Sequence, residues 1–151
     1  PRGPRAHAGL TGRKTAGDLY GGFARQGASA LSGKDPSRPE RVGACAARAA
    51  AVSVVAAGLA EECEARLSYA PGESAPLGVG VETFGSGVEP DEAILERLLG
   101  AVDFRVAALA ERFGLWALPS ERGGRFYADL ACFGQMGRSE LDPPWERPVP
   151  I

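Results

Sequence analysis

Two segments near the middle of the chain alternate between apolar and polar residues, and this pattern constrains the fold more than any other feature. The segments are 63–69 (CEARLSY) and 77–83 (LGVGVET), and the residues between them, 71–76, are rich in proline and glycine. Alternation with a period of two is typical of a strand with one buried face, and proline with glycine is typical of a turn. The sequence therefore predicts a hairpin made of a strand, a loop and a second strand.

A long helix is predicted just before this hairpin, over residues 39–57. Pro39 and Glu40 suit the first turn of a helix, and Gly58 is a residue that commonly follows the last turn. The small apolar residues of this segment recur at helical spacing, which predicts one face packed closely on a sheet. They are residues 42, 46, 49, 52 and 56.

The remaining segments carry weaker signals. Leucine and isoleucine over residues 94–99 predict a second helix that ends at Gly100, and a third helix is predicted from a cap at Asp103 through Arg112. Residues 15–20 are interpreted as a strand among frequent glycines. The tail from residue 133 contains several prolines, so it is predicted to be irregular and to lie on the surface.

Length and composition favour one soluble globular domain. The chain has 151 residues, of which 44% are hydrophobic and 24% are charged, and it has no apolar run of membrane-spanning length. No signal peptide is predicted, because the first residues contain no hydrophobic stretch. Cys45, Cys63 and Cys132 lack the paired spacing of a zinc site or a disulfide framework. Buried free thiols are expected, which fits a reducing, cytoplasmic location.

Positive charge is concentrated in the first third of the chain, where nine Arg and Lys residues face three acidic ones up to residue 48. The two lysines of the whole chain, Lys14 and Lys34, both lie in glycine-bounded segments, 8–14 and 32–38. Glycine lets the backbone approach a ligand, and Arg with Lys binds phosphate, so polyphosphate is the predicted ligand. The alternative is that these are solvated loop charges. Few aromatic residues accompany the cations, so nucleic acid is not predicted as a partner. No membrane partner is predicted either, because no apolar run has membrane-spanning length.

Several segments, in order along nearly the whole chain, match a known family. They resemble the C-terminal domain of S-adenosylmethionine synthetase, which is also called methionine adenosyltransferase. The resemblance implies an α+β fold: a single two-layer domain with a mixed sheet covered by helices on one face. The matching residues are 3–4, 8–14, 20–22, 32–37, 46–48, 68–70, 81–85, 134, 137–138 and 144–146.

The resemblance also implies an activity. Members of the family are transferases of one-carbon metabolism that have three similar domains. They form S-adenosylmethionine from ATP and L-methionine at sites between two subunits, and they hydrolyse the bound tripolyphosphate with the help of Mg²⁺ and K⁺. By resemblance, residues 1–151 are a C-terminal-like domain and a fragment, since the N-terminal and central domains are absent.

Site residues follow by matching position. Arg13, Lys14 and Lys34 match the tripolyphosphate-binding cations, of which Lys14 and Lys34 are the catalytic candidates. Arg38 stands where the family usually has a Lys near the phosphates and methionine, so it is a candidate for both ATP and substrate binding. Glu40 takes the place of an Asp that holds magnesium, and it is either a metal ligand or an ordinary acidic residue of a first helical turn.

Other positions depart from the family pattern. His7 replaces an Asp that contacts the substrates, and it is either a new catalytic base or a solvated loop residue. Pro71 replaces an Ile beside the methionine pocket, and Gln26 and Gln135 stand where His is common. These departures affect substrate binding more than the fold.

Three functional hypotheses follow. In the first, the chain is the tripolyphosphate-binding portion of a methionine adenosyltransferase that works with a complementary N-terminal chain or as a homo-oligomer, and it is inactive alone. In the second, it is a non-catalytic paralogue that serves as an association or polyphosphate-binding module. In the third, the weakest, it is a basic nucleic-acid-binding module with steep salt dependence. An apolar strand face with Leu77, Val79 and Val81 is predicted to support association.

Overall fold

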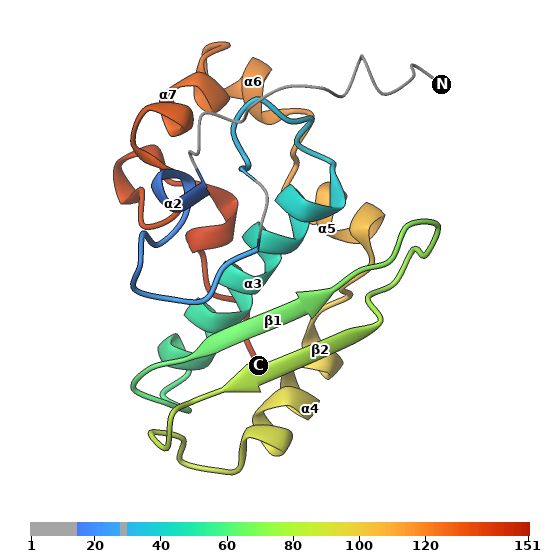
Figure 1. Cartoon of the computed structure of the whole chain (residues 1–151), viewed down its shortest axis with the longest axis vertical. Helices are drawn as coiled ribbons and strands as arrows, with labels where there is room; N and C mark the ends of the chain where they lie inside the picture. The colour runs from blue at the N-terminus through green and yellow to red at the C-terminus, as the bar shows by residue number, and fades with distance from the viewer. Residues whose placement is uncertain (1–14, 28–29) are drawn as a thin grey trace.

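Helix α3, Pro39–Ala56, is the central element of the computed structural model, which describes residues 15–27 and 30–151 (Figure 1). The helix begins after Arg38, with proline in its first turn. It ends before Gly58, whose φ of +71° lies in the left-handed region that favours glycine. The predicted helix over residues 39–57 is therefore confirmed.

The buried face of α3 departs from the predicted one near the C-terminal end. Ser53 and Val54 are buried there, whereas Ala56 is exposed. The hydroxyl of Ser53 donates a hydrogen bond to the carbonyl of Ala49 at 2.6 Å and accepts one from the amide of Val149 at 2.8 Å. A buried hydroxyl is tolerated when its hydrogen bonds are made, so the C-terminal segment can pack at this position.

The predicted hairpin is confirmed. Strands β1, Glu64–Ser68, and β2, Gly78–Glu82, pair antiparallel, with Leu67 opposite Val79. Among the described residues this two-stranded antiparallel sheet takes the place of the predicted mixed sheet. Segment 15–20 was expected to be a further strand but is not one. No strand in the described residues therefore pairs in parallel with β1 or β2.

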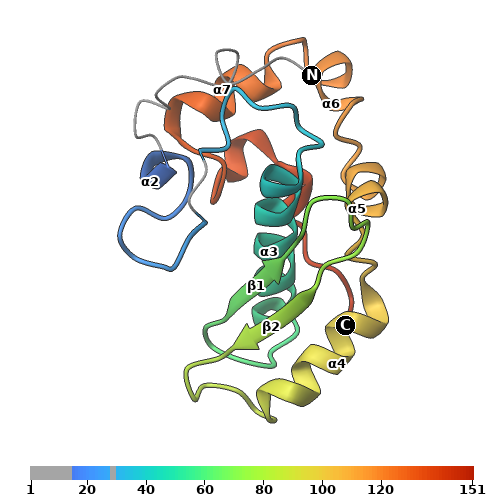
Figure 2. The ribbon, with the colours of Figure 1, turned by 45° about the vertical axis from the view of Figure 1, so that its right-hand side comes forward.

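Helices cover one face of the hairpin, as expected for a two-layer α+β domain. In both views α3 lies behind the two strands, and α4, Asp91–Ala101, packs against β2 (Figures 1 and 2). Val79 and Val81 point to this covered side and pack against the core. The apolar face predicted to support association is therefore turned inward, and only Leu77, which is 70% exposed, remains outside.

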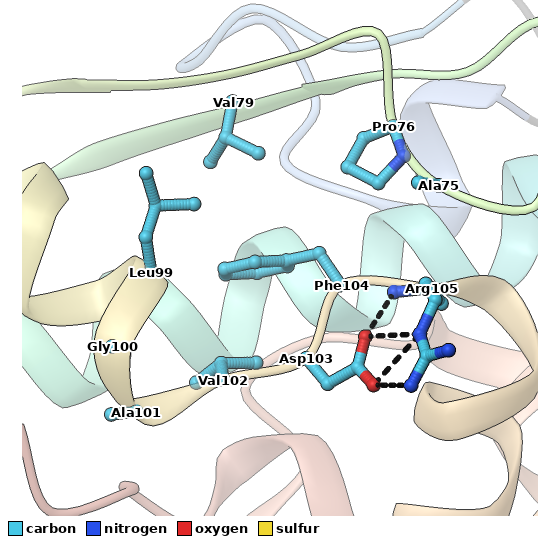
Figure 3. Close-up of a pocket in the computed structure, with 10 residues that line it drawn as sticks. All are labelled: Ala75, Pro76, Val79, Leu99, Gly100, Ala101, Val102, Asp103, Phe104 and Arg105. Carbon is cyan, nitrogen blue, oxygen red and sulfur yellow. Dashed lines mark hydrogen bonds and ion pairs between the residues drawn. The ribbon is translucent and has the colours of Figure 1, made fainter.

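The third helix is shorter than predicted. Helix α5, Val106–Arg112, begins three residues after Asp103, which does not cap it. Asp103 instead accepts hydrogen bonds from the amide of Arg105 at 3.0 Å and from its Nε at 2.9 Å (Figure 3). Because these contacts occupy the carboxylate, they hold the link between α4 and α5 in an extended turn.

Residues 15–18 form a helical turn, α2, Thr15–Asp18, so the prediction of a strand at 15–20 is wrong. The turn packs on helix α7, Phe126–Phe133, close to Gly134. A Cβ atom at Gly134 would lie 2.6 Å from the carbonyl oxygen of Gly17, and φ at Gly134 is +96°. Glycine is therefore required at 134 for both the backbone conformation and the close approach.

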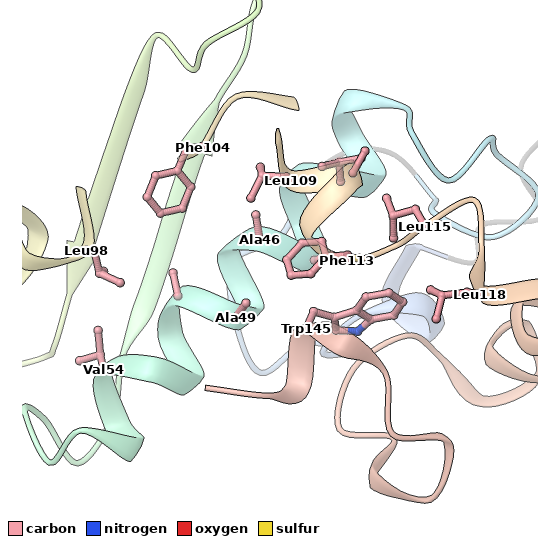
Figure 4. Close-up of a cluster of buried hydrophobic side chains, with 14 of the residues drawn as sticks. Ala46, Ala49, Val54, Leu98, Phe104, Leu109, Phe113, Leu115, Leu118 and Trp145 are labelled. Carbon is pink, nitrogen blue, oxygen red and sulfur yellow. The ribbon is translucent and has the colours of Figure 1, made fainter. Parts of the chain in front are cut away.

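The C-terminal tail is largely irregular, as predicted, but the prediction that it lies on the surface is wrong for Gln135, Pro143 and Trp145, which are buried. It contains two short 3-10 helices, η1, Ser139–Leu141, and η2, Pro144–Glu146, after helices α6, Leu118–Glu121, and α7. Trp145 is fully buried, and its ring lies 6.3 Å from Phe113 and 6.1 Å from Phe126 in edge-to-face geometry (Figure 4). The buried Trp145 side chain, rather than a long helix or a strand, holds the tail in place.

The expectation of buried free thiols is confirmed only in part. The three cysteines are free thiols, but only Cys45 is buried; Cys63 is half-buried and Cys132 is exposed, at the end of α7 beside solvent. No helix in the described part of the chain is long and apolar enough to cross a membrane.

Candidate functional site

Lys34 and Arg38 lie in the loop that leads into α3. The loop turns at Gly33, whose φ of +81° is a left-handed conformation suited to glycine. Asp35 then accepts hydrogen bonds from the amide of Ser37, at 2.9 Å, and from the Ser37 hydroxyl. This local turn brings the chain to the first residues of α3, so both cations stand at the positive end of an 18-residue helix.

Glu40 lies between these two cations. Its Oε1 is 3.8 Å from Nζ of Lys34, and its Oε2 is 3.6 Å from Nε of Arg38. A hydrogen bond from its own backbone amide, followed by the charges of Lys34 and Arg38, holds the pKa of Glu40 below its ordinary value. The side chains are 26%, 41% and 55% exposed for Lys34, Glu40 and Arg38, so water weakens these pairs. A ligand with several negative charges can therefore compete with the single carboxylate.

A hollow of about 400 Å³ opens beside Lys34. Arg41, which is only 4% exposed, borders it, and the guanidinium of Arg41 lies 4.5 Å from the centre of the Tyr127 ring. Two cations therefore face one concave surface, which favours an anionic ligand. The lining residues are Gly33, Lys34, Pro36, Arg41, Tyr127, Ala128 and Ala131.

Some residues that hold this site were missed at the level of sequence. Asp18, Arg41 and Gln135 are buried polar residues around the Lys34 loop. Asp18 and Arg41 were not site candidates, and Gln135 was noted only as a departure from the His that is common in the family. One signal was present: Asp18 is the single acidic residue before position 35 in a strongly cationic segment. Its partners lie more than ten residues away, however, so no local pattern reveals them.

The other predicted site residues fall into two groups. His7, Arg13 and Lys14 lie outside the described residues. Pro71 is exposed in the loop between β1 and β2, and it does not border the hollow beside Lys34 within the described part of the chain. The structure thus brings together Lys34, Arg38 and Glu40 of the predicted set.

A larger hollow, of about 660 Å³, lies between α4, the link to α5 and the end of the β1–β2 loop (Figure 3). Its walls include Pro76, Val79, Leu99 and Phe104. The two charged residues of this hollow, Asp103 and Arg105, form an ion pair, so their charges neutralise each other. Hydrogen bonds from the Arg105 side chain lower the pKa of Asp103 to about 2. This hollow contains none of the predicted site residues, so it is separate from the candidate phosphate site.

The described residues do not form a complete set of metal ligands. Within 15–27 and 30–151, no three His, Cys, Asp or Glu side chains gather as a ligand set. Magnesium is usually bound by one or two carboxylates together with phosphate oxygens and water. Glu40 fits the role of one such carboxylate, because it lies beside the cations to which phosphates would bind.

Comparison with known proteins places the whole described site within one family. The family model for "S-adenosylmethionine synthetase, C-terminal domain" matches residues 2–147. Proteins named S-adenosylmethionine synthase are similar to the chain: one from Synechococcus elongatus is 51% identical over 145 residues, and one from Trichormus variabilis is 50% identical over the same length. These alignments cover 96% of this chain but only 35% and 34% of the relatives.

The chain therefore spans about a third of the length of the relatives it matches, and the match covers the loop, the helix and the buried tail described above. The chain belongs to the S-adenosylmethionine synthetase family, and residues 2–147 correspond to its C-terminal domain.

Proposed function

We propose that this chain is the tripolyphosphate-binding part of a methionine adenosyltransferase. The observation that supports this proposal most is the arrangement of Lys34 and Arg38 at the positive end of α3, next to a hollow that Lys34 and Arg41 border. Backbone amides and the dipole at a helix N-terminus favour phosphate groups, and nearby Lys and Arg side chains add charge. Arg13 and Lys14 complete the proposed set.

The proposed reaction joins ATP and L-methionine. The methionine sulfur attacks the ribose carbon that bears the triphosphate, the carbon–oxygen bond breaks, and tripolyphosphate leaves with the bonding electrons. Negative charge therefore develops on the phosphate oxygens, where Lys14 and Lys34 would stabilise it as catalytic residues. Arg13 and Arg38 would hold the remaining phosphate oxygens.

The proposed cofactors are Mg²⁺ and K⁺. Glu40 would hold magnesium together with the phosphate oxygens of ATP, and the bound ion would neutralise part of the phosphate charge. Potassium rests on the family resemblance alone. Residues His7, Arg38 and Pro71 are the proposed contacts on the methionine side.

Because the chain spans about a third of its relatives, the proposed activity needs residues from elsewhere. These would come from a complementary N-terminal chain or from another subunit. The direct test mixes the chain with the N-terminal part of the Synechococcus elongatus relative and measures S-adenosylmethionine by mass spectrometry, in the presence of ATP, methionine, Mg²⁺ and K⁺.

Two controls make this test decisive. The C-terminal part of the Synechococcus elongatus relative should restore activity in the same mixture, and a Lys34→Ala variant of this chain should not. If the relative's own C-terminal part gives product and this chain gives none, the proposed catalytic contribution is wrong.

A second function, an association or polyphosphate-binding module without catalysis, has one observation in its favour. Glu40, the proposed metal ligand, already lies within 4 Å of two cations, Lys34 and Arg38, at 3.8 and 3.6 Å. Binding of tripolyphosphate without any product in the mixing experiment would support this second function.

A further inference from the structure

The loop that carries Lys34 is fastened to the protein by four buried or half-buried polar residues, which we call the anchor network: Asp18, Ser32, Arg41 and Gln135. Asp18 and Gln135 are fully buried, and Arg41 is 4% exposed. Burial of a charged side chain is costly unless hydrogen bonds and an opposite charge compensate. The network therefore has to be held in one arrangement, and it fixes the loop in the same arrangement.

Asp18 holds the beginning of the loop. Its Oδ2 accepts hydrogen bonds from the amides of Leu31, at 2.8 Å, and Ser32, at 2.7 Å. Its Oδ1 accepts one from the hydroxyl of Ser32 at 2.6 Å. Three hydrogen bonds to one buried carboxylate determine the direction of two successive amides, so the chain enters Gly33 in a fixed orientation.

Arg41 holds the other end of the loop. Its Nη1 donates a hydrogen bond of 2.7 Å to the carbonyl of Lys34, and its guanidinium lies over the ring of Tyr127. A planar guanidinium can donate hydrogen bonds in two fixed directions at once. A lysine ammonium can also donate several hydrogen bonds, but their directions are much less fixed. The second direction leads to Gln135, whose Oε1 lies 3.3 Å from Nη2 of Arg41.

Gln135 connects the two charged ends. Its Nε2 donates to the hydroxyl oxygen of Ser32 at 3.1 Å, while Ser32 donates to Asp18. The hydrogen bonds thus run in one direction, from Arg41 through Gln135 and Ser32 to Asp18. The backbone of Gln135 is fixed as well, because its amide donates to the carbonyl of Asp18 at 2.9 Å and its carbonyl accepts from Trp145 at 2.7 Å.

We propose that Arg41 is a positioning residue for Lys34: by holding the Lys34 carbonyl, and through Gln135 the opposite end of the loop, it directs the Lys34 ammonium toward the phosphate-binding hollow. The inference rests on the proposed function for its ligand, tripolyphosphate. The competing explanation is that Arg41, which also borders the hollow, binds phosphate directly. The two explanations differ in whether the effect of Arg41 depends on the presence of Lys34.

The first test is a double-mutant cycle measured by calorimetry with tripolyphosphate at low salt. Arg41→Lys keeps the charge but loses the planar donor geometry, and Gln135→Met removes the bridge at similar size. With Lys34 present, we expect each variant to weaken binding by about tenfold, the scale for losing a charge-assisted hydrogen bond. In a Lys34→Ala background the same changes should alter affinity by less than about twofold.

A matched control exists in the chain. Arg112→Lys makes the same substitution at an exposed position of α5. This variant should bind tripolyphosphate as the unaltered chain does. Equal losses for Arg41→Lys with and without Lys34 would overturn the positioning role in favour of direct binding, and no loss at all would overturn it too.

The second test needs no ligand, so it separates this inference from the proposed function. Amide hydrogen exchange of the free chain should become faster at Leu31, Ser32 and Lys34 in Arg41→Lys and Gln135→Met, while the amide of the core residue Leu109 keeps its rate. Faster exchange everywhere, or nowhere, would overturn the inference. If the unaltered chain binds no tripolyphosphate, the proposed function is wrong, and this exchange pattern alone decides whether Arg41 and Gln135 hold the loop.

Discussion

Replacing Glu40 by glutamine should change two properties of the chain in opposite directions. Glu40 is a negative charge beside the cations that would bind the proposed phosphate ligand, at 3.8 Å from Lys34 Nζ and 3.6 Å from Arg38 Nε. Glu40→Gln removes this charge and keeps the size of the side chain. Tripolyphosphate would then no longer compete with an internal anion for the two cations.

The magnitude follows from the geometry. Two unit charges about 4 Å apart interact by about 1 kcal/mol in water, and the exposure of Glu40 places it near this limit. We therefore expect metal-free tripolyphosphate to bind about fivefold more tightly to Glu40→Gln. Stability should fall slightly, because an acidic residue in a first helical turn contributes about 0.3–1 kcal/mol, or about 1 to 3 °C in Tm.

The assay is calorimetry in EDTA, together with thermal unfolding of the free chain. Glu92→Gln is the matched control, because Glu92 is the exposed second residue of α4 just as Glu40 is the second residue of α3. The control should lose a similar amount of Tm and leave tripolyphosphate affinity unchanged. Weaker or unchanged binding by Glu40→Gln in EDTA would refute the electrostatic reasoning.

Magnesium decides between the two roles considered for Glu40. If Glu40 is a metal ligand, adding Mg²⁺ should strengthen tripolyphosphate binding more in the unaltered chain than in Glu40→Gln. If Glu40 is only an acidic residue of the first helical turn, the increase should be the same in both proteins.

Three further predictions concern packing, cysteine chemistry and activity. Gly134→Ala should lower the free energy of unfolding by about 2 kcal/mol or more, because a Cβ would lie 2.6 Å from the Gly17 carbonyl at a positive φ; an unchanged urea midpoint would contradict this close approach. At pH 8 a thiol reagent should label exposed Cys132 first and Cys45 last, since burial raises the pKa of Cys45 to about 12 and leaves little thiolate; peptide mass spectrometry that finds Cys45 labelled first would contradict the burial. The chain alone should form no S-adenosylmethionine from ATP and methionine, because positioning of both substrates is worth about 7 to 11 kcal/mol of barrier lowering and needs residues beyond this chain; product above a heat-denatured control would contradict the assignment.

The sequence predicts the elements whose signals are local. Pro39, Glu40 and Gly58 mark the ends of α3 within a residue or two, and period-two alternation locates both strands. Each of these signals depends on residues next to one another along the chain, so tertiary contacts need not be known in advance.

The errors occur where distant contacts decide the local structure. Residues 15–18 are helical, because Asp18 points inward to bind the amides of Leu31 and Ser32 and the turn packs beside Gly134. Part of the tail is buried, because the Trp145 ring packs against Phe113 and Phe126. Neither contact leaves a periodic trace in the sequence, so propensity and composition alone could not reveal them.

The residues of the candidate site also fall into those that the sequence predicted and those that only the structure revealed. Lys34, Arg38 and Glu40 were predicted together, from their positions in one short segment and from the family resemblance. Arg41 was missed as part of the site, and Gln135 was noted only as a departure from the family pattern, because the two residues that bond to each other are 94 positions apart. Cations that meet a ligand can thus be recognised in sequence, whereas the groups that hold them in place are seen only in the folded chain.

The most direct test of the central claim is the affinity of this chain for tripolyphosphate, measured by calorimetry at low salt for the unaltered chain and for Lys34→Ala. The account predicts measurable binding that Lys34→Ala weakens by about 1 to 3 kcal/mol, the range for a charge-assisted hydrogen bond. No heat of binding for the unaltered chain, or the same affinity without the Lys34 side chain, would contradict the claim that this loop binds polyphosphate.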